Sequence, residues 1–289
     1  MTHSTRHREG QLEGQGGLQI YWQAWEPATA AARSAATLVI AHGYGEHGGR
    51  YAELAQYLVA RGSTVYAIDH RGHGRSLGRR GYIDRFDNAL ADLDQLVDLA
   101  RSEQSGRPLI LLGHSLGGLL TLKYAIELQH KVDAVVLSGP GVSLNAASAL
   151  LKLTSRVLSV LAPRLGLLQL QPADMSRDVA EVAAYAADPL NFHGKVPARI
   201  GGEALGFLAD LPARLRKVTL PLLALHGKAD ALAGVEGSEM VVRTVQSQDK
   251  TLLVYDGALH EIFHELAPER ARVMADLAQW IAARSASVA

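Results

Sequence analysis

Short continuous apolar runs alternate with amphipathic segments along most of the chain. Such runs are typical of strands buried on both faces of a parallel sheet, whereas residues 18–25 alternate as an exposed or edge strand does. Between the runs, Phe86, Leu90 and Leu93 recur at helical spacing. The alternation of strand and helix predicts a doubly wound, mostly parallel α/β sheet. The other expected strands are residues 37–41, 64–68, 109–112, 132–137, 222–225 and 251–255.

The strand signal disappears in one long stretch past the middle of the chain. There, Leu153, Val157 and Leu161 belong to an apolar helical stripe, which Pro163 ends. Signals for strands and helices return near Pro221. This pattern predicts a helical cap inserted into an α/β core. The expected boundaries are 143–212 for the cap, and 1–142 with 213–289 for the core.

The composition excludes several classes of function. The chain has 289 residues, with 29 acidic and 29 basic side chains and no cysteine. A net charge of zero gives no reason to expect nucleic-acid binding. The absence of cysteine from the sequence excludes disulfides, thiol catalysis and thiolate metal sites.

No segment of the sequence has the pattern of a membrane span or a secretory signal. The longest apolar stretch, residues 149–170, is interrupted by Lys152, Arg156 and Arg164, and a spanning helix needs about 20 nearly uninterrupted apolar residues. Residues 1–10 are polar. We therefore expect a cytoplasmic protein, with peripheral membrane association if the apolar cap rests on lipid.

The segment Gly113-His114-Ser115-Leu116-Gly117 has the pattern G-x-S-x-G. An apolar strand precedes it and a helical pattern follows it, which is the strand–turn–helix setting of a nucleophile elbow. We expect a strained backbone at the serine and close approach of neighbouring chain at both glycines. The amide of Leu116 then lies at a helix N-terminus, where an oxyanion would form.

A serine hydroxyl needs a base to take its proton, and that base needs an acid to orient it. In folds with this elbow, the order along the chain is serine, acid, histidine. Asp230 follows one expected strand and His260 follows the last one. We therefore assign Ser115 as nucleophile, Asp230 as acid and His260 as base. The alternative for Asp230 is an ordinary turn aspartate.

A competing motif overlaps the expected base. Residues 260–264 spell H-E-x-x-H, the signature of zinc peptidases, which requires a helix that turns both imidazoles toward one metal. Here the motif begins where a strand ends, and the clear amphipathic helix starts later, near Pro268. The serine triad is therefore favoured, and a zinc hydrolase is kept as an alternative class.

Two sequence blocks are more specific than G-x-S-x-G. HGYGEHGGRY occupies residues 42–51 and DHRGHGRS occupies residues 69–76. Together with GHSLGG at 113–118 and DPL at 188–190, they resemble the monoacylglycerol lipase and lysophospholipase family of α/β-hydrolases. The resemblance spans about residues 17–283, including the cap.

The resemblance implies an eight-stranded α/β-hydrolase sheet with an inserted cap, and it implies the same triad. It also implies that the amides of Tyr44 and Leu116 form the oxyanion hole. Glu46, Arg50 and Tyr185 match residues around the glycerol end of the substrate. For Glu46 and Arg50, an ion pair that braces their own loop is an equally weighted alternative. The chemistry requires no cofactor and no metal.

The sequence departs from the family's animal members at two positions. Those members have a second histidine three residues after the catalytic one, where this chain has Phe263. Ala231 follows Asp230 where arginine is common. Both departures affect the expected specificity for the glycerol head, and neither affects the acyl transfer.

Four arginines, Arg71, Arg75, Arg79 and Arg80, form a basic run after Asp69. The chain has no broader basic face, so we interpret the run as a solvated loop with internal turn contacts. Asp69 precedes the serine in the chain, against the expected order of the triad, so we expect it to hold this loop.

The expected reaction is hydrolysis of a monoacylglycerol to fatty acid and glycerol through an acyl-enzyme. Lysophospholipase or general carboxylesterase activity is the alternative, because the same triad serves all three. A non-catalytic binding protein on this scaffold is a further class, which an intact triad disfavours. The apolar residues of the cap predict an acyl tunnel, with membrane or micelle contact as a second hypothesis. These residues are Leu150, Leu151, Leu153, Val157, Leu158, Leu161, Leu167, Leu168 and Leu170.

Overall fold

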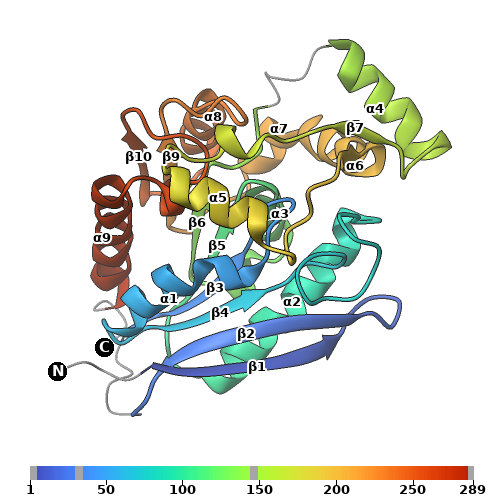
Figure 1. Ribbon diagram of the computed structural model, residues 1–289. Helices are drawn as coiled ribbons and strands as arrows, with labels where there is room; N and C mark the ends of the chain where they lie inside the picture. Colours follow the sequence, from blue (N-terminus) through green and yellow to red (C-terminus); the bar gives the residue numbers. More distant parts are fainter. Residues whose placement is uncertain (1–4, 30–34, 144–148, 286–289) are drawn as a thin grey trace.

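The main body of the molecule is a single twisted sheet of eight strands in the order β1-β2-β4-β3-β5-β6-β9-β10 (Figure 1). A computed structural model describes residues 5–29, 35–143 and 149–285, without the side chains of 149–152. The pairs β1–β2 and β2–β4 are antiparallel, and the remaining pairs in this sheet are parallel. The strands are β1 (Thr5–Glu13), β2 (Gln19–Pro27), β3 (Thr37–Ala41), β4 (Thr64–Ile68), β5 (Leu109–His114), β6 (Ala134–Ser138), β9 (Leu222–Gly227) and β10 (Lys250–Tyr255).

The expected α/β-hydrolase sheet is confirmed, and seven of its strands lie where the apolar runs predict them. The strand without a sequence signal is β1. It is an edge strand that pairs with β2, and its residues are exposed or half-buried along its whole length. Its one apolar side chain, Leu12, is half-buried against the core, and a single apolar residue makes no run to detect.

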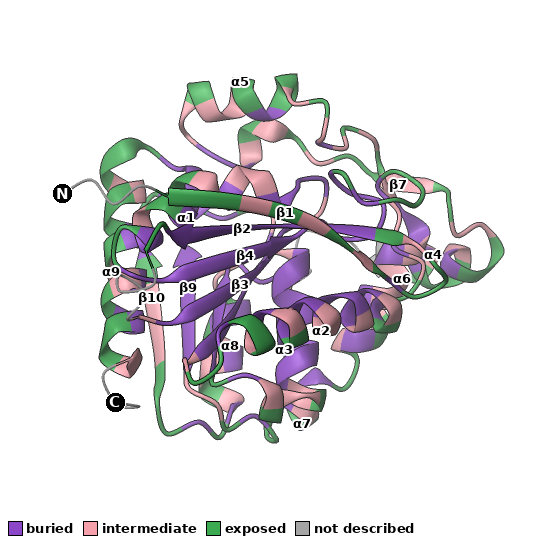
Figure 2. Cartoon of the chain, turned by 90° about the horizontal axis from the view of Figure 1, so that it is seen from below, coloured by how far each residue is buried: buried purple, intermediate pink, exposed green. Residues whose placement is uncertain are grey.

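Helices cover both faces of the sheet and enclose two apolar cores (Figure 2). On one face, α2 (Phe86–Glu103), α3 (Leu116–Glu127) and α8 (Glu236–Thr244) pack against the strands. On the other face lie α1 (Ala52–Val59) and α9 (Ala267–Ser285). The expected apolar stripe on α2 is buried, as the helical spacing predicts.

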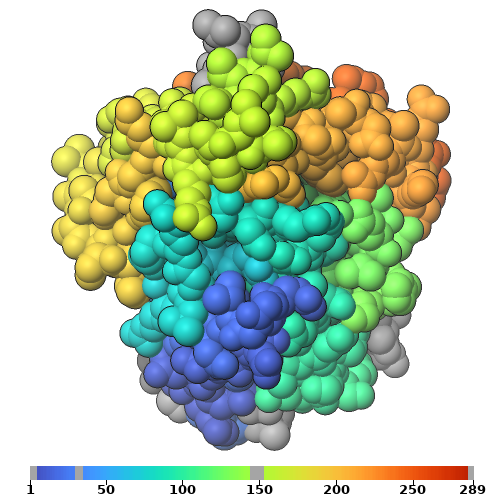
Figure 3. All heavy atoms as spheres, turned by 90° about the vertical axis from the view of Figure 1, so that its right-hand side faces the viewer, coloured from blue at the N-terminus to red at the C-terminus, as the bar shows by residue number. Residues whose placement is uncertain are grey.

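Between β6 and β9, the described residues contribute no strand to the main sheet. They form α4 (Ala149–Leu161), α5 (Val179–Ala187), α6 (Ala198–Leu208) and α7 (Leu211–Leu215), together with a separate pair of short strands, β7 (Gly166–Leu168) and β8 (Val196–Pro197). Part of the expected cap boundary, residues 144–148, lies outside the described residues. In Figure 3, the α4 segment (yellow-green) forms the upper part of the face shown.

Four 3₁₀ helices complete the described elements: η2 (Gly48–Tyr51), η3 (Gln129–Lys131), η4 (Pro172–Asp174) and η5 (Ile262–His264). Within residues 5–29, 35–143 and 149–285, no helix is both long enough and apolar enough to span a bilayer.

Candidate active site

Ser115 lies at the sharp turn between β5 and α3. Its φ of 52° and ψ of −113° make it the one non-glycine residue with positive φ among those the structure describes. The turn is closely packed, because a Cβ built on Gly113 would lie 2.2 Å from the Gly117 carbonyl oxygen. A Cβ on Gly117 would lie 2.0 Å from the Ala41 carbonyl oxygen. The expected strain at the serine and close approach at both glycines are confirmed.

Asp230 and His260 meet at the carboxyl ends of two neighbouring parallel strands, β9 and β10. His260 Nδ1 lies 2.6 Å from Asp230 Oδ2, and both side chains are buried. The other carboxylate oxygen of Asp230 accepts the amides of Leu232 and Ala233, each at 2.9 Å. The carboxylate is therefore fixed on one side and turned toward the imidazole on the other.

Burial and hydrogen bonding act in opposite directions on this pair. Burial works to raise the pKa of Asp230, but hydrogen bonds from His226 and His260 outweigh it and hold that pKa well below its usual range. Burial works to lower the pKa of His260, whereas the hydrogen bond and charge of Asp230 raise it above its ordinary value. An ionised acid beside a basic imidazole is the arrangement that general-base catalysis requires.

Ser115 and His260 border one cavity of about 310 Å³, which Tyr44 and Leu116 also line. Within the described part of the chain, no hydrogen bond joins the Ser115 hydroxyl to His260. Catalytic hydrogen bonds often tighten only when a substrate is bound. Leu116 is the first residue of α3, so its amide has no acceptor within that helix.

The wall of the cavity away from the serine is mostly apolar and comes from both parts of the chain. Besides Tyr44 and Leu116, the core contributes Leu119, Leu232 and Ala233, and the segment between β6 and β9 contributes more of the apolar lining. That segment supplies Leu167, Leu168, Leu170, Val196, Pro197, Ile200, Ala204 and Leu205. Three of the nine apolar cap residues singled out in the sequence therefore reach the cavity. Two others, Leu150 and Leu151, have side chains outside the described residues.

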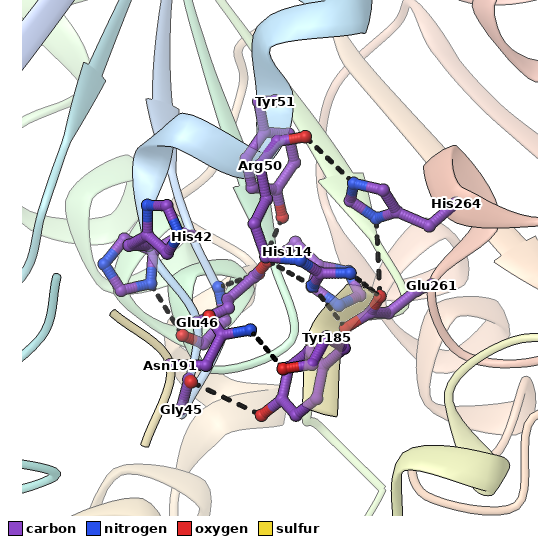
Figure 4. Close-up of polar contacts among 12 residues, drawn as sticks. His42, Gly45, Glu46, Arg50, Tyr51, His114, Tyr185, Asn191, Glu261 and His264 are labelled. Atoms are coloured by element: carbon purple, nitrogen blue, oxygen red, sulfur yellow. Dashed lines mark hydrogen bonds and ion pairs between the residues drawn. The ribbon is translucent and has the colours of Figure 1, made fainter. Parts of the chain in front are cut away.

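Glu46 and Arg50 do not line the cavity in the described structure and instead form a buried ionic cluster (Figure 4). The Arg50 guanidinium donates to Glu46 at 2.9 Å, and it donates to both oxygens of Glu261 at 2.8 and 2.7 Å. Tyr185 lies against this cluster, with its ring 4.9 Å from the guanidinium carbon of Arg50. The sequence does not predict Glu261 as a partner of Arg50, because its only local signal is the H-E-x-x-H motif.

The two histidines of the H-E-x-x-H motif have different partners. His260 bonds to Asp230, whereas His264 Nε2 lies 3.0 Å from the backbone oxygen of Arg50. The intervening turn is the short 3₁₀ helix η5. This geometry directs the two imidazoles to separate protein groups.

Asp69 and the arginine run hold the loop that follows β4. Asp69 accepts the amides of Gly48 and Arg75, each at 2.8 Å, as expected for a residue that fixes this loop. Arg71 differs from the expectation of a solvated side chain: it is buried and forms a bidentate pair with Asp92 on α2 at 2.8 and 2.9 Å. The buried carboxylate on α2 explains this difference, and no local sequence pattern reveals it.

Comparisons with known proteins show the family to which the chain belongs. The family profile "Serine aminopeptidase, S33" matches residues 32–267. The chain is 41% identical to "Monoacylglycerol lipase" of Mycolicibacterium smegmatis over 97% of this chain and 99% of that protein. It is 34% identical to "Monoglyceride lipase" of Homo sapiens over 94% of this chain and 89% of that protein.

A solved structure has the same fold. It is a soluble variant of monoglyceride lipase from Saccharomyces cerevisiae in complex with a substrate analogue, with a TM-score of 0.87 at 24% identity. The match covers 97% of this chain and 96% of that one. From the profile match and the identity to its relatives, the chain belongs to the monoacylglycerol lipase family of serine α/β-hydrolases.

Proposed function

We propose that this protein hydrolyses the ester bond of monoacylglycerols to fatty acid and glycerol, with Ser115 as its nucleophile. The observation that carries the proposal is the buried Asp230–His260 pair, whose histidine lines the same apolar-walled cavity as Ser115. A strained serine, a fixed base and an apolar cavity together suit an ester whose acyl part is a hydrocarbon chain.

In the proposed mechanism, His260 takes the proton of Ser115 as the hydroxyl oxygen attacks the ester carbonyl. The Nδ1–H of His260 donates to Asp230, which leaves Nε2 free to act as the base. The amides of Tyr44 and Leu116 hold the oxyanion. His260 then protonates the departing glycerol and later activates the water that releases the fatty acid. No step requires a cofactor or a metal.

The proposed cap, residues 143–212, determines which acyl chain reaches the serine. Most of the apolar cavity wall belongs to this segment, whereas the triad belongs to the proposed core of residues 1–142 and 213–289. A change in the cap would therefore alter substrate preference while the acyl-transfer chemistry stays in place.

Tyr185 is our proposed contact for the glycerol end of the substrate. It lines a smaller pocket beside the main cavity. Tyr44, Gln169 and Leu170 line both. The contacts of Glu46 and Arg50 favour the bracing role over direct contact with substrate, because their charged groups are already paired with protein partners.

Contact with a membrane or micelle through the cap is a second part of the proposal, and it would give a cytoplasmic enzyme a peripheral place on lipid. On α4, the side chains of Leu153, Val157, Val160 and Leu161 are 60%, 48%, 72% and 76% exposed. Apolar side chains gathered on one exposed helix are typical of elements that rest on lipid.

A hydrolysis panel tests the main proposal. Purified protein is assayed on monoacyl-, diacyl- and triacylglycerols, lysophospholipids and short p-nitrophenyl esters, beside Ser115→Ala. We expect monoacylglycerols to give the highest kcat/KM and the alanine variant to be inactive. Preference for lysophospholipids, or for short synthetic esters alone, would overturn the monoacylglycerol assignment and favour the alternative activities. Labelling of Ser115 by a fluorophosphonate excludes a non-catalytic binding protein.

A further inference from the structure

The residue after the proposed base, Glu261, is held in a buried bidentate ion pair. Its two carboxylate oxygens accept from the two terminal nitrogens of Arg50 at 2.8 and 2.7 Å. The side chains of Arg50 and Glu261 are only 8% and 6% exposed. Arg50 lies in η2, next to the loop with the oxyanion amide of Tyr44, so the pair joins two segments that are 211 residues apart in the chain.

The contacts of Arg50 continue directly into the oxyanion loop. Its guanidinium donates to Glu46, whose other carboxylate oxygen accepts the Gly43 amide at 2.6 Å and the Tyr51 hydroxyl at 2.8 Å. Gly43 immediately precedes Tyr44, the proposed oxyanion donor. One continuous set of hydrogen bonds therefore runs from this loop, through Glu46 and Arg50, to the residue beside His260 (Figure 4).

The proposed cap closes the third side of this cluster. The amide of Glu261 donates to the Met175 carbonyl at 2.7 Å, and the Tyr185 ring lies against the Arg50 guanidinium. His264 adds a contact to the Arg50 carbonyl at 3.0 Å. Arg50 and Glu261 thus lie where the oxyanion loop, the base loop and the cap meet.

We propose that Arg50 and Glu261 are positioning residues, whose buried bidentate pair fixes the His260 loop relative to the oxyanion loop. This inference rests on the proposed function of Ser115 and His260, and it assigns to Glu261 a role that the family resemblance does not. Neither side chain lines the cavity in the described structure, so both act through their neighbours.

Two physical arguments support a positioning role over simple stabilisation. The desolvation cost of a buried ion pair offsets much of its attraction, so such a pair is a weak source of net stability. A planar guanidinium that donates two parallel hydrogen bonds does fix distance and orientation. Catalysis is sensitive to this geometry, because a misplacement of about 1 Å can reduce a rate by about 10²-fold.

The pair also places a negative charge beside the base. Burial lowers the pKa of His260, while the carboxylates of Asp230, Glu261 and Glu46 raise it. Other titratable or charged groups lie against these residues: the ring centroid of His114 is 4.7 Å from that of His260, and His226 Nε2 is 3.3 Å from Asp230. Arg50 and His264 both contact Glu261, at 2.7 and 3.4 Å. Removal of the charge at position 261 would therefore lower the pKa of His260 and leave the Arg50 charge without that partner.

The experiment separates geometry from charge with two variants and a matched control. Glu261→Gln keeps the shape of the side chain and removes its charge. Arg50→Lys keeps the positive charge and loses the bidentate contact. Asp92→Asn is the control, because Asp92 forms a similar buried bidentate pair with Arg71 and neither residue lines the cavity. The readout is the rate at which a fluorophosphonate modifies Ser115 between pH 5 and 9, with thermal unfolding measured alongside.

We expect Glu261→Gln to lower the rate of modification by about 10²-fold and to move its acidic limb to lower pH. Arg50→Lys should lower the rate without moving that limb. Asp92→Asn should lower the thermal midpoint and leave both rate and limb at their wild-type values. Glu261→Asp, which keeps the charge, should restore the position of the limb.

The positioning proposal is overturned if Glu261→Gln and Arg50→Lys behave like Asp92→Asn, with lowered thermal midpoints and wild-type rates wherever the proteins are folded. Because the reagent reports on Ser115 directly, the result does not depend on which ester is the substrate. If wild-type protein is modified by the reagent and yet hydrolyses no monoacylglycerol, the substrate assignment fails while the positioning test remains decisive.

Discussion

At the scale of single residues, the least ordinary feature is the backbone of Ser115. Its φ is 52° and its ψ is −113°. This conformation is strained for any residue that has a Cβ, whereas glycine adopts it freely. Ser115 lines the cavity, so the strain lies at the proposed nucleophile. Strain kept for function in this way is expected to lower stability.

This strain predicts different stabilities for two inactive variants. The free energy of unfolding of Ser115→Gly should exceed that of Ser115→Ala by about 1–2 kcal/mol, because only glycine adopts this conformation without strain. Urea unfolding of both proteins measures the difference. Equal midpoints for the two variants would show that the turn relaxes when the hydroxyl is lost.

Four buried histidines predict a loss of stability in weak acid. Burial lowers the pKa of His70 to about 3, and those of His73 and His114 to about 4, and it holds the pKa of His42 well below 6.5. The unfolded chain therefore binds these protons first, and the free energy of unfolding should fall as pH falls from about 6.5 toward 4.

The contribution of His260 to the free energy of unfolding changes in the opposite direction over that pH range. Its pKa is raised by folding, so its contribution to stability is present below the unfolded pKa and is lost as pH rises through the folded one. One group of this kind only partly offsets four of the other. Denaturant unfolding at pH 7, 6 and 5 measures the balance, and a constant midpoint over this range would contradict it.

At the scale of elements, the sequence predicts the buried strands but does not reveal contacts between residues that are far apart in the chain. The strands β3 to β6 and the elbow at Ser115 carry local signals, so their places follow from apolar runs and from G-x-S-x-G. The edge strand β1 has a single apolar residue, the half-buried Leu12, and therefore no such signal. Glu261 and Arg71 find their partners only in the folded chain, so their pairing is not readable from local sequence.

Helix α6 offers a test of the proposed acyl cavity. Leu205 is half-buried and lines the cavity, so Leu205→Trp should shorten the accessible space. We expect kcat/KM for long-chain monoacylglycerols to fall by about tenfold or more, with short esters little affected. Val179→Trp is the control, because Val179 is 80% exposed on α5 and does not line the cavity. An equal loss on short and long esters would show that the change disturbs the triad instead.

Helix α4 offers a test of lipid contact. Replacement of Val160 and Leu161 by serine removes two of its most exposed apolar side chains and should reduce co-sedimentation with phosphatidylcholine liposomes. Val179→Ser removes an equally exposed apolar side chain from α5 and should leave binding unchanged. If the α4 double variant binds liposomes as well as the wild type does, the helix is not the site of contact.

At the scale of the whole molecule, the sheet places the chemistry and the segment above it shapes the cavity. Asp230 and His260 follow adjacent parallel strands, and Ser115 follows β5, so the three residues converge at the same edge of the sheet. The order serine, acid, histidine was enough to predict this convergence. The size of the cavity and the division of its walls depend on how distant segments pack, which the sequence pattern does not determine.

The chain leaves the sheet at the end of β6 and returns to it at β9, which is the strand next to β6. The pairing of β6 with β9 is therefore complete without the intervening segment. In evolutionary terms, this segment can be exchanged as one cassette between related proteins, with both splice points at neighbouring strands. A single recombination event at these two points would change the range of esters that the protein accepts and leave the residues on the sheet unchanged.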